Sequence, residues 1–167
     1  MLAVIAVAIV SVVVGVGVGA QTSKQTVVTS AGDTVDLDSL RLSHAYASVG
    51  FDTRRNGGNG TFLDQWQIDK SGASRFTDLF RTIPGFRLQY VGSRTLIAST
   101  RGGKKCVTYW LDKVRWHDTR PTDANDIARP REVAALEAYP GVAPAEFANH
   151  QGCATVVIWT KTRLGVQ

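Results

Sequence analysis

Charged residues are missing from the start of the chain, where the first one is Lys24. Residues 1–20 form the apolar run MLAVIAVAIVSVVVGVGVGA, which ends in small residues before Gln21. Such an ending is typical of a secretory signal peptide, although the usual basic residues before the apolar run are absent. The alternative is a retained membrane anchor, because about 20 apolar residues can span a bilayer. We favour a cleaved signal peptide over residues 1–20, and either interpretation places the rest of the chain outside the cytoplasm.

Cysteine is scarce, with 2 residues in 167. Outside the cytoplasm an even number of cysteines is most simply a disulfide, so Cys106 and Cys153 are predicted to be joined. Each stands at the start of a strand-like run. Two free buried cysteines are one alternative, and a zinc site of Cys106, His117, His150 and Cys153 is another. We disfavour zinc because Cys106 and His117 are too far apart for the usual knuckle, and we expect no metal and no cofactor.

Motifs of common enzymes and nucleotide-binding proteins are also missing. The glycines at 57, 58 and 60 are not followed by Gly-Lys-Ser/Thr, and there is no Gly-x-Ser-x-Gly elbow. The acidic residues between 112 and 126 lie in a loop-like segment rather than in a recognisable pair. The net charge of +5 is spread along the chain. We therefore expect a non-enzymatic protein without catalytic residues and without a nucleic-acid partner.

The apolar spacing predicts short helices between short strands. One helix is marked by apolar residues at helical spacing and ends at Pro84-Gly85. Those apolar residues are Phe76, Leu79, Phe80 and Ile83. Apolar and polar residues alternate over 86–90, which predicts a strand with one solvent-exposed face. Tyr90 falls on the apolar face. A second helix is expected to begin at Pro130 and to give way to a strand over Leu136–Tyr139. The fold class is therefore α+β, a small mixed β-sheet with short helices.

The chain divides into four parts on composition. After the signal peptide, residues 21–50 are polar without a sustained apolar period and are expected to form a flexible N-terminal arm. Residues 51–161 hold all the predicted helices and strands and form one folded domain. Residues 162–167 are a C-terminal tail.

Taken in order, several short motifs resemble the plug domains of TonB-dependent outer-membrane receptors over residues 51–161. The matching stretches are 78–86, 99–102, 109–114, 126–141 and 152–161. The residues that carry the resemblance are Leu79, Arg81, Pro84, Gly85, Arg101, Gly102, Asp112, Glu137, Gly141, Gly152, Thr160 and Lys161. Lys113 stands where the family has glycine, and Cys153-Ala154 replaces part of a glycine pair. We expect altered local geometry at both places.

The resemblance implies a plug-domain-like fold and a non-enzymatic module of outer-membrane uptake that gates or docks with a β-barrel. It implies a location in the cell envelope, periplasm or outer membrane, of a Gram-negative-type bacterium. In the family the plug runs into a barrel, and the 6 residues after Lys161 are too few for a barrel strand of about ten residues. The chain is therefore expected to be a plug without its barrel.

The partner implied is an outer-membrane β-barrel or a TonB-like energising protein. The segment Thr26-Val27-Val28-Thr29-Ser30 is similar to the TonB box that recruits the energising protein. A small molecule or a metal chelate is the class of substrate implied, and the sequence does not identify it. The alternative function is a free periplasmic ligand-binding or protein-interaction domain with the plug fold.

Overall fold

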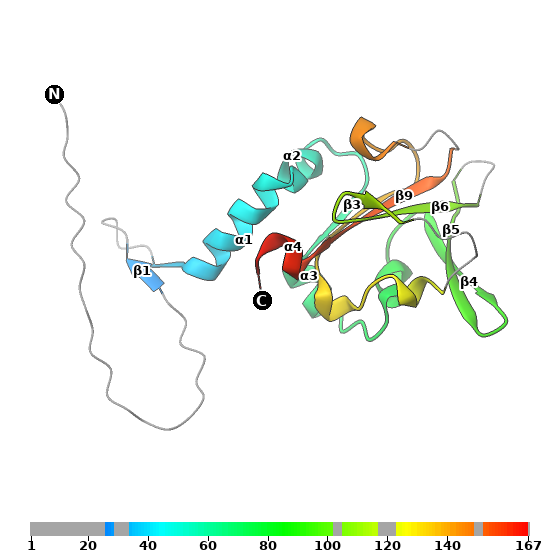
Figure 1. The fold of residues 1–167 in the computed structure, drawn as a ribbon, viewed down its shortest axis with the longest axis horizontal. Helices are drawn as coiled ribbons and strands as arrows, with labels where there is room; N and C mark the ends of the chain where they lie inside the picture. The colour runs from blue at the N-terminus through cyan, green and yellow to red at the C-terminus, as the bar shows by residue number, and fades with distance from the viewer. Residues whose placement is uncertain (1–25, 29–33, 102–104, 117–122, 149–151, 167) are drawn as a thin grey trace, which may run out of the picture.

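A five-stranded mixed sheet lies at the centre of the protein (Figure 1). The computed structural model describes residues 26–28, 34–101, 105–116, 123–148 and 152–166. The strand order is β3 (Thr61–Asp64), β8 (Val133–Tyr139), β9 (Ala154–Thr160), β6 (Val107–Leu111) and β7 (Val114–Arg115). Strands β6 and β9 are parallel, and the other neighbours are antiparallel. The mixed sheet and the short helices confirm the predicted α+β class.

The two central strands, β8 and β9, form the most buried part of the sheet. All seven residues of β8 are buried, as are the first six of β9. The prediction of a helix from Pro130 to Leu136 is wrong beyond its first turn, because only η3 (Pro130–Glu132) is helical, as a 3₁₀ turn. The strand begins at Val133. Burial on both faces between β3 and β9 outweighs the weak strand preference of the alanines.

One face of the sheet is covered by η1 (Phe76–Arg81), η2 (Ala124–Asp126) and α3 (Gln65–Lys70). The predicted helix forms as the 3₁₀ helix η1, and its apolar residues together with Ile83 are at most 3% exposed. Strands β4 (Phe86–Val91) and β5 (Arg94–Ser99) form a separate two-stranded sheet that projects from the body in Figure 1. Phe86 is buried against Phe80, with ring centroids 5.6 Å apart. Tyr90, expected on the buried side, is 72% exposed because it lies near the hairpin tip.

The other face is covered by α1 (Leu37–Ser48), α2 (Phe51–Asn56), η4 (Ala145–Phe147) and α4 (Lys161–Leu164). The prediction of a flexible arm up to residue 50 is therefore wrong from Leu37 onward. Four residues of this segment have helical spacing and pack on the sheet: Leu42, Ala45, Tyr46 and Val49. The Tyr46 hydroxyl donates to the Ala134 carbonyl at 2.9 Å and accepts from the Gln65 amide at 2.9 Å.

One further sheet lies outside these layers. Strands β1 (Thr26–Val28) and β2 (Thr34–Asp36) pair with each other as a separate two-stranded sheet. Within the described part of the chain, no helix is both long enough and apolar enough to cross a membrane.

The turn between β6 and β7 has two residues, Asp112 and Lys113, although plug domains have glycine where Lys113 stands. Asp112 and Lys113 both have positive φ, 50° and 72°, which is the geometry of a type I′ turn. Side chains with a Cβ rarely adopt this conformation. The Asp112 carboxylate accepts hydrogen bonds from the Thr160 amide at 2.8 Å and from its hydroxyl at 2.7 Å, which hold the turn against β9.

We predict that Lys113→Gly raises the free energy of unfolding by up to about 1 kcal/mol. The left-handed conformation costs a non-glycine residue about 1–2 kcal/mol, and the greater freedom of unfolded glycine offsets part of the gain. Lys113→Ala is the matched control, because it removes the charge and keeps the Cβ. Urea denaturation of the three proteins would contradict this account if glycine and alanine shifted the midpoint equally.

Leu79→Ala should lower the free energy of unfolding by about 2–5 kcal/mol, because it opens a cavity in the core. Leu79 is 2% exposed, whereas Leu40 on α1 is 50% exposed. The control Leu40→Ala should change stability by less than about 0.5 kcal/mol. Similar midpoints for the two variants would show that the η1 face does not form the core.

Candidate functional site

Most of the residues that carry the family resemblance lie in three places in the fold. One group lies at the end of the sheet where β6 and β9 begin, a second lies at the opposite end, and Glu137 is buried between them. Leu79 is a core residue, and Arg81 is exposed and paired with Asp78 at 3.0 Å. Gly102, Thr29 and Ser30 lie outside the described residues.

The predicted disulfide is confirmed and joins the first residues of two neighbouring strand runs. The Cα atoms of Cys106 and Cys153 are 4.9 Å apart, and the Ala154 amide donates to the Cys106 carbonyl at 3.1 Å. Parallel pairing of Val107 with Ala154 continues directly from this link. The bond uses both sulfur atoms of the alternative zinc set, whose histidines, His117 and His150, lie outside the described residues. Among the described residues, no three His, Cys, Asp or Glu side chains are grouped as metal ligands.

A recess of about 320 Å³ opens beside this disulfide. Its lining is mostly apolar or glycine, with one cation: Arg101, Pro140, Gly141, Val142, Ala143, Ala148, Gly152 and Cys153. The Pro84-Gly85 turn packs against it, since a Cβ on Gly85 would lie 2.5 Å from the Cβ of Pro140. The sequence motifs at 84–85, 101, 141 and 152 therefore meet at one place.

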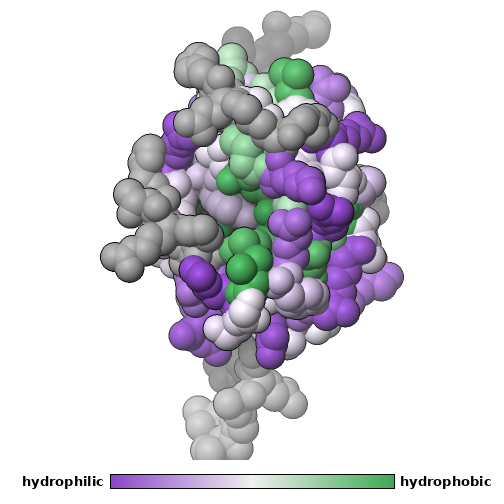
Figure 2. All heavy atoms as spheres, turned by 90° about the vertical axis from the view of Figure 1, so that its right-hand side faces the viewer, coloured by the Kyte–Doolittle hydropathy of each residue, from purple (hydrophilic) through white to green (hydrophobic). Residues whose placement is uncertain are grey.

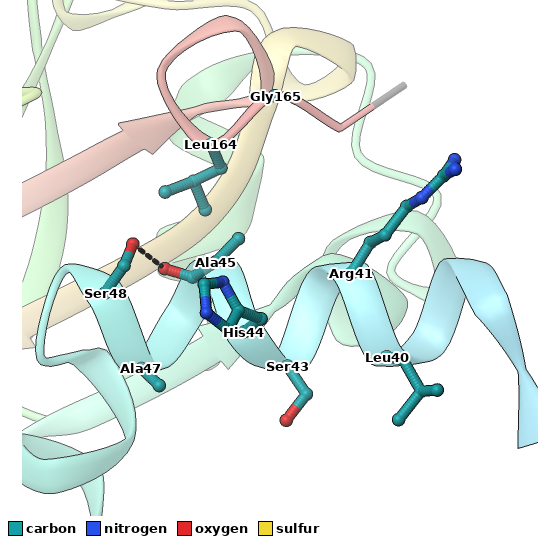
Figure 3. A pocket seen from close by; sticks show the side chains of 9 residues that line it. All are labelled: Leu40, Arg41, Ser43, His44, Ala45, Ala47, Ser48, Leu164 and Gly165. Carbon is teal, nitrogen blue, oxygen red and sulfur yellow. Dashed lines mark hydrogen bonds between the residues drawn. The ribbon is translucent and has the colours of Figure 1, made fainter.

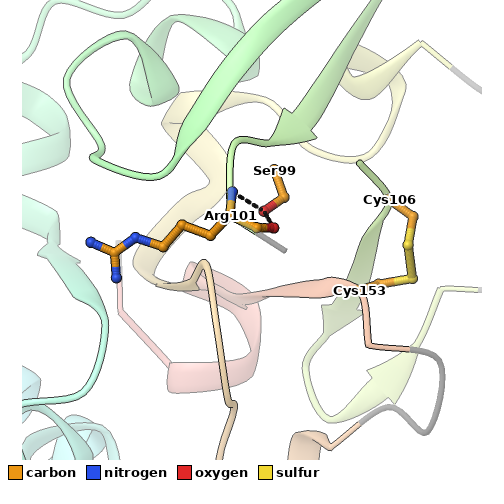
Figure 4. The surroundings of a disulfide bond; sticks show 4 residues. All are labelled: Ser99, Arg101, Cys106 and Cys153. Atoms are coloured by element: carbon orange, nitrogen blue, oxygen red, sulfur yellow. Dashed lines mark hydrogen bonds between the residues drawn. A yellow bond between two sulfur atoms is a disulfide. The ribbon is translucent and has the colours of Figure 1, made fainter. Parts of the chain in front are cut away.

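Arg101 is the exposed cation of this recess. The Ser99 hydroxyl accepts from the Arg101 amide at 3.1 Å and donates to the Arg101 carbonyl at 2.9 Å, which fixes the backbone. The Arg101 side chain extends away from the disulfide in Figure 4. The guanidinium forms no ion pair with any residue that the structure describes. Val142 in the same recess is 91% exposed.

The surface at the end of the sheet where β6 and β9 begin carries both apolar and hydrophilic side chains. Figure 2 shows apolar side chains near its middle, with hydrophilic side chains beside them. An exposed apolar surface next to an unpaired cation is a common composition for a surface that binds another molecule.

Glu137 lies at the centre of a buried polar cluster that sequence analysis identified only in part. Its side chain is 0% exposed, and Arg54 of α2 donates to both of its carboxylate oxygens, through Nε at 2.8 Å and Nη2 at 2.6 Å. The Tyr139 hydroxyl and the Trp159 indole each donate to it at 2.6 Å. Four donors fill the acceptor positions of the carboxylate.

Arg54 joins this cluster to the surface. Its Nη1 donates to Glu146 of η4 at 2.7 Å, and Nη2 also donates to the Val49 carbonyl at 3.0 Å. The guanidinium carbon lies 5.1 Å from the centre of the Phe147 ring. One side chain therefore ties the α1–α2 junction to the sheet and to η4.

The pKa values follow from this burial. Burial alone would lower the pKa of Arg54, but the hydrogen bonds and charge of Glu137 outweigh it and raise that pKa. Burial, together with its hydrogen bond to Glu137, raises the pKa of Tyr139. Burial raises the pKa of Tyr46 to about 12. Arg54, Tyr139 and Tyr46 therefore keep their usual protonation states near neutral pH.

The opposite end of the sheet contains Asp112, Thr160 and Lys161. Thr160 caps α4 by accepting from the Arg163 amide at 3.0 Å, and it donates its hydroxyl to Asp112. Lys161 is the first residue of α4. The hydrogen bonds between Asp112 and Thr160 hold the β6–β7 turn against the end of β9.

A wider recess, of about 860 Å³, lies between α1 and the end of α4. Leu164 points toward α1 above Ala45, whereas Leu40 and Ser43 extend from the far side of that helix (Figure 3). None of the site residues predicted from the sequence lines it.

No protein-family model matches the chain, and no curated protein matches its sequence. Similar solved structures include FpvA of P. aeruginosa bound to a heterologous pyoverdine, at 17% identity and a TM-score of 0.48. Others are a ferric enterobactin receptor (PfeA) variant from Pseudomonas aeruginosa, at 20% and 0.49, and the ferric yersiniabactin uptake receptor FyuA from Yersinia pestis, at 19% and 0.47. These are TonB-dependent siderophore receptors, the class whose plug domains the sequence motifs resemble.

The matches cover 60%, 62% and 61% of this chain, and 14%, 18% and 17% of those three chains in the same order. The chain therefore spans only a small part of the length of each receptor that it matches. What those receptors bind does not identify the ligand of this chain.

We predict that Arg54→Met lowers the free energy of unfolding by about 3–5 kcal/mol, because it leaves the buried Glu137 carboxylate without its cation. Arg55→Met is the matched control on the same helix. Arg55 pairs with Asp64 at 3.2 Å with its side chain 42% exposed, so its loss should cost at most about 1 kcal/mol. The double variant Arg54→Met, Glu137→Gln should recover part of the loss. Urea denaturation with the disulfide intact measures the wild type and the three variants. Equal effects at positions 54 and 55 would contradict a stabilising role for the buried Arg54–Glu137 ion pair.

Proposed function

We propose that this chain is a non-enzymatic plug module that docks with an outer-membrane β-barrel and recruits a TonB-like energising protein. The observation that carries the proposal is the convergence of the motif residues on one recess, where Arg101 has no described ion-pair partner and Val142 is 91% exposed. A guanidinium in this position suits a carboxylate of a covering partner. The exposed valine supplies apolar contact beside it.

The disulfide and the two buried strands support the docking role because they hold the recess rigid. Gly141 follows the end of β8, and Cys153 precedes β9, so both walls of the recess begin at fixed backbone. A surface that is ordered before binding loses little entropy when a partner covers it. The Arg101 backbone is similarly held by Ser99.

The docking role is tested by purifying the tagged full chain from detergent-solubilised outer membranes of its own bacterium. We expect a β-barrel outer-membrane protein to co-purify with the wild type and to fall about tenfold or more with the variant Arg101→Glu, Val142→Asp. Arg131→Glu, at an exposed arginine of η3 away from the recess, is the matched charge control and should retain the barrel. Absence of a barrel with the wild type, or equal recovery with all three proteins, contradicts the proposal.

The second candidate is a free periplasmic ligand-binding domain, which the size of the recess favours. A cavity of about 320 Å³ lies at the lower end of the range for small-molecule sites. Native mass spectrometry of the purified wild type discriminates the two candidates. A stoichiometric small molecule that is lost in the Arg101→Glu, Val142→Asp variant, with no barrel recovered, would favour the free domain.

A further inference from the structure

The tip of the β4–β5 hairpin carries apolar side chains that lie outside the core. Tyr90 is 72% exposed and Val91 is 49% exposed, whereas Phe86 at the start of β4 is 7% exposed. The hairpin projects from the body of the protein in Figure 1. Exposed apolar side chains on a projecting strand indicate a contact with another molecule when the backbone beside them is also unpaired.

The register of the hairpin determines which backbone groups of β4 point away from β5. Val91 lies opposite Arg94 across a two-residue turn, so these two residues exchange hydrogen bonds. The exchange recurs at every second residue of an antiparallel pair. Leu88 and Tyr90 therefore direct their amide and carbonyl groups outward. The amide of Thr95, the residue opposite Tyr90, agrees with this register, because it donates to the Asp123 carboxylate at 3.1 Å rather than to β4.

The outward groups of Leu88 and Tyr90 form no other hydrogen bond within the part of the chain that the structure describes. Strand β4 is six residues long and pairs with β5 alone in its sheet. Its outer edge thus presents two amide donors and two carbonyl acceptors beside the exposed Tyr90 ring. A row of unpaired backbone groups of this kind is a template for another strand.

The sequence of β4 is complementary to itself at this edge. A two-fold axis through Gln89 places Leu88 opposite Tyr90 of a second copy, and the two such pairs exchange four hydrogen bonds. Each exposed Tyr90 ring then packs on the half-buried Leu88 of the other copy. On the opposite face Arg87 lies beside Val91 of the second copy, so no two charges of like sign are directly opposed. We propose that two copies of this chain pair through β4 in this register and form a continuous four-stranded sheet.

This pairing goes beyond the proposed function and does not use the residues of the recess. Arg101 and Pro140 lie beside Gly85, which precedes β4, whereas the pairing is centred on Gln89 toward the hairpin tip. One short strand edge is a small contact, so the dimer forms reversibly. The net charge of +5 opposes the approach of two copies, and added salt should therefore strengthen the dimer.

Sedimentation velocity of the purified full chain over a series of concentrations tests the proposal, and we expect a monomer–dimer equilibrium. Gln89→Lys and Gln89→Glu each place two like charges opposite each other at the axis, and each should raise the dissociation constant about tenfold or more. An equal mixture of the two variants places lysine opposite glutamate and should recover the dimer. Asn59→Lys adds the same charge at an exposed position before β3 and should dimerise as the wild type does.

A second variant tests the backbone pairing itself. Tyr90→Pro removes one outward amide donor and the exposed ring, and it should be monomeric at every concentration. The Tyr90 amide does not pair with β5, so this variant should keep the wild-type denaturation midpoint at low protein concentration.

A wild type that stays monomeric at all concentrations overturns the proposal. A dimer that survives both Gln89→Lys and Tyr90→Pro means that another surface joins the copies, and a mixture that fails to recover the dimer rejects the two-fold register. A monomeric wild type whose recovery of a β-barrel is lost in Tyr90→Pro would make a strand of the barrel, rather than a second copy, the occupant of this edge.

Discussion

The buried carboxylate of Glu137 is the constraint on which the rest of the fold depends. It lies in β8, the strand paired on both sides, and a charge in that position requires a cation and a full set of donors. Three elements supply them: Arg54 comes from α2, Tyr139 from β8 itself and Trp159 from β9. The chain between residues 49 and 54 must therefore return to this face of the sheet, which explains why α1 and α2 belong to the domain.

The same strands build the candidate docking surface. Because β8 and β9 are antiparallel, the residues after β8 and those before β9 lie at the same end of the sheet. The recess at Pro140, Gly141 and Cys153 is thus made from the ends of the two most buried strands, and the disulfide extends this rigid frame to β6. Rigid strands position loop residues accurately, so Arg101 and Val142 are presented at fixed places although they are exposed.

Local patterns in the sequence were sufficient for part of this structure. The spacing of Phe76, Leu79, Phe80 and Ile83 predicted the helix and its buried face, and the two cysteines at strand starts predicted the bond. Helix α1 was missed because Leu42, Ala45, Tyr46 and Val49 stand among polar residues, and their spacing is recognisable only when a helix of 12 residues is considered. Within VAALEAY, a glutamate among apolar residues signals a buried charge that needs a partner. No local pattern identifies Arg54 as that partner, because the contact spans 83 residues and depends on the complete fold.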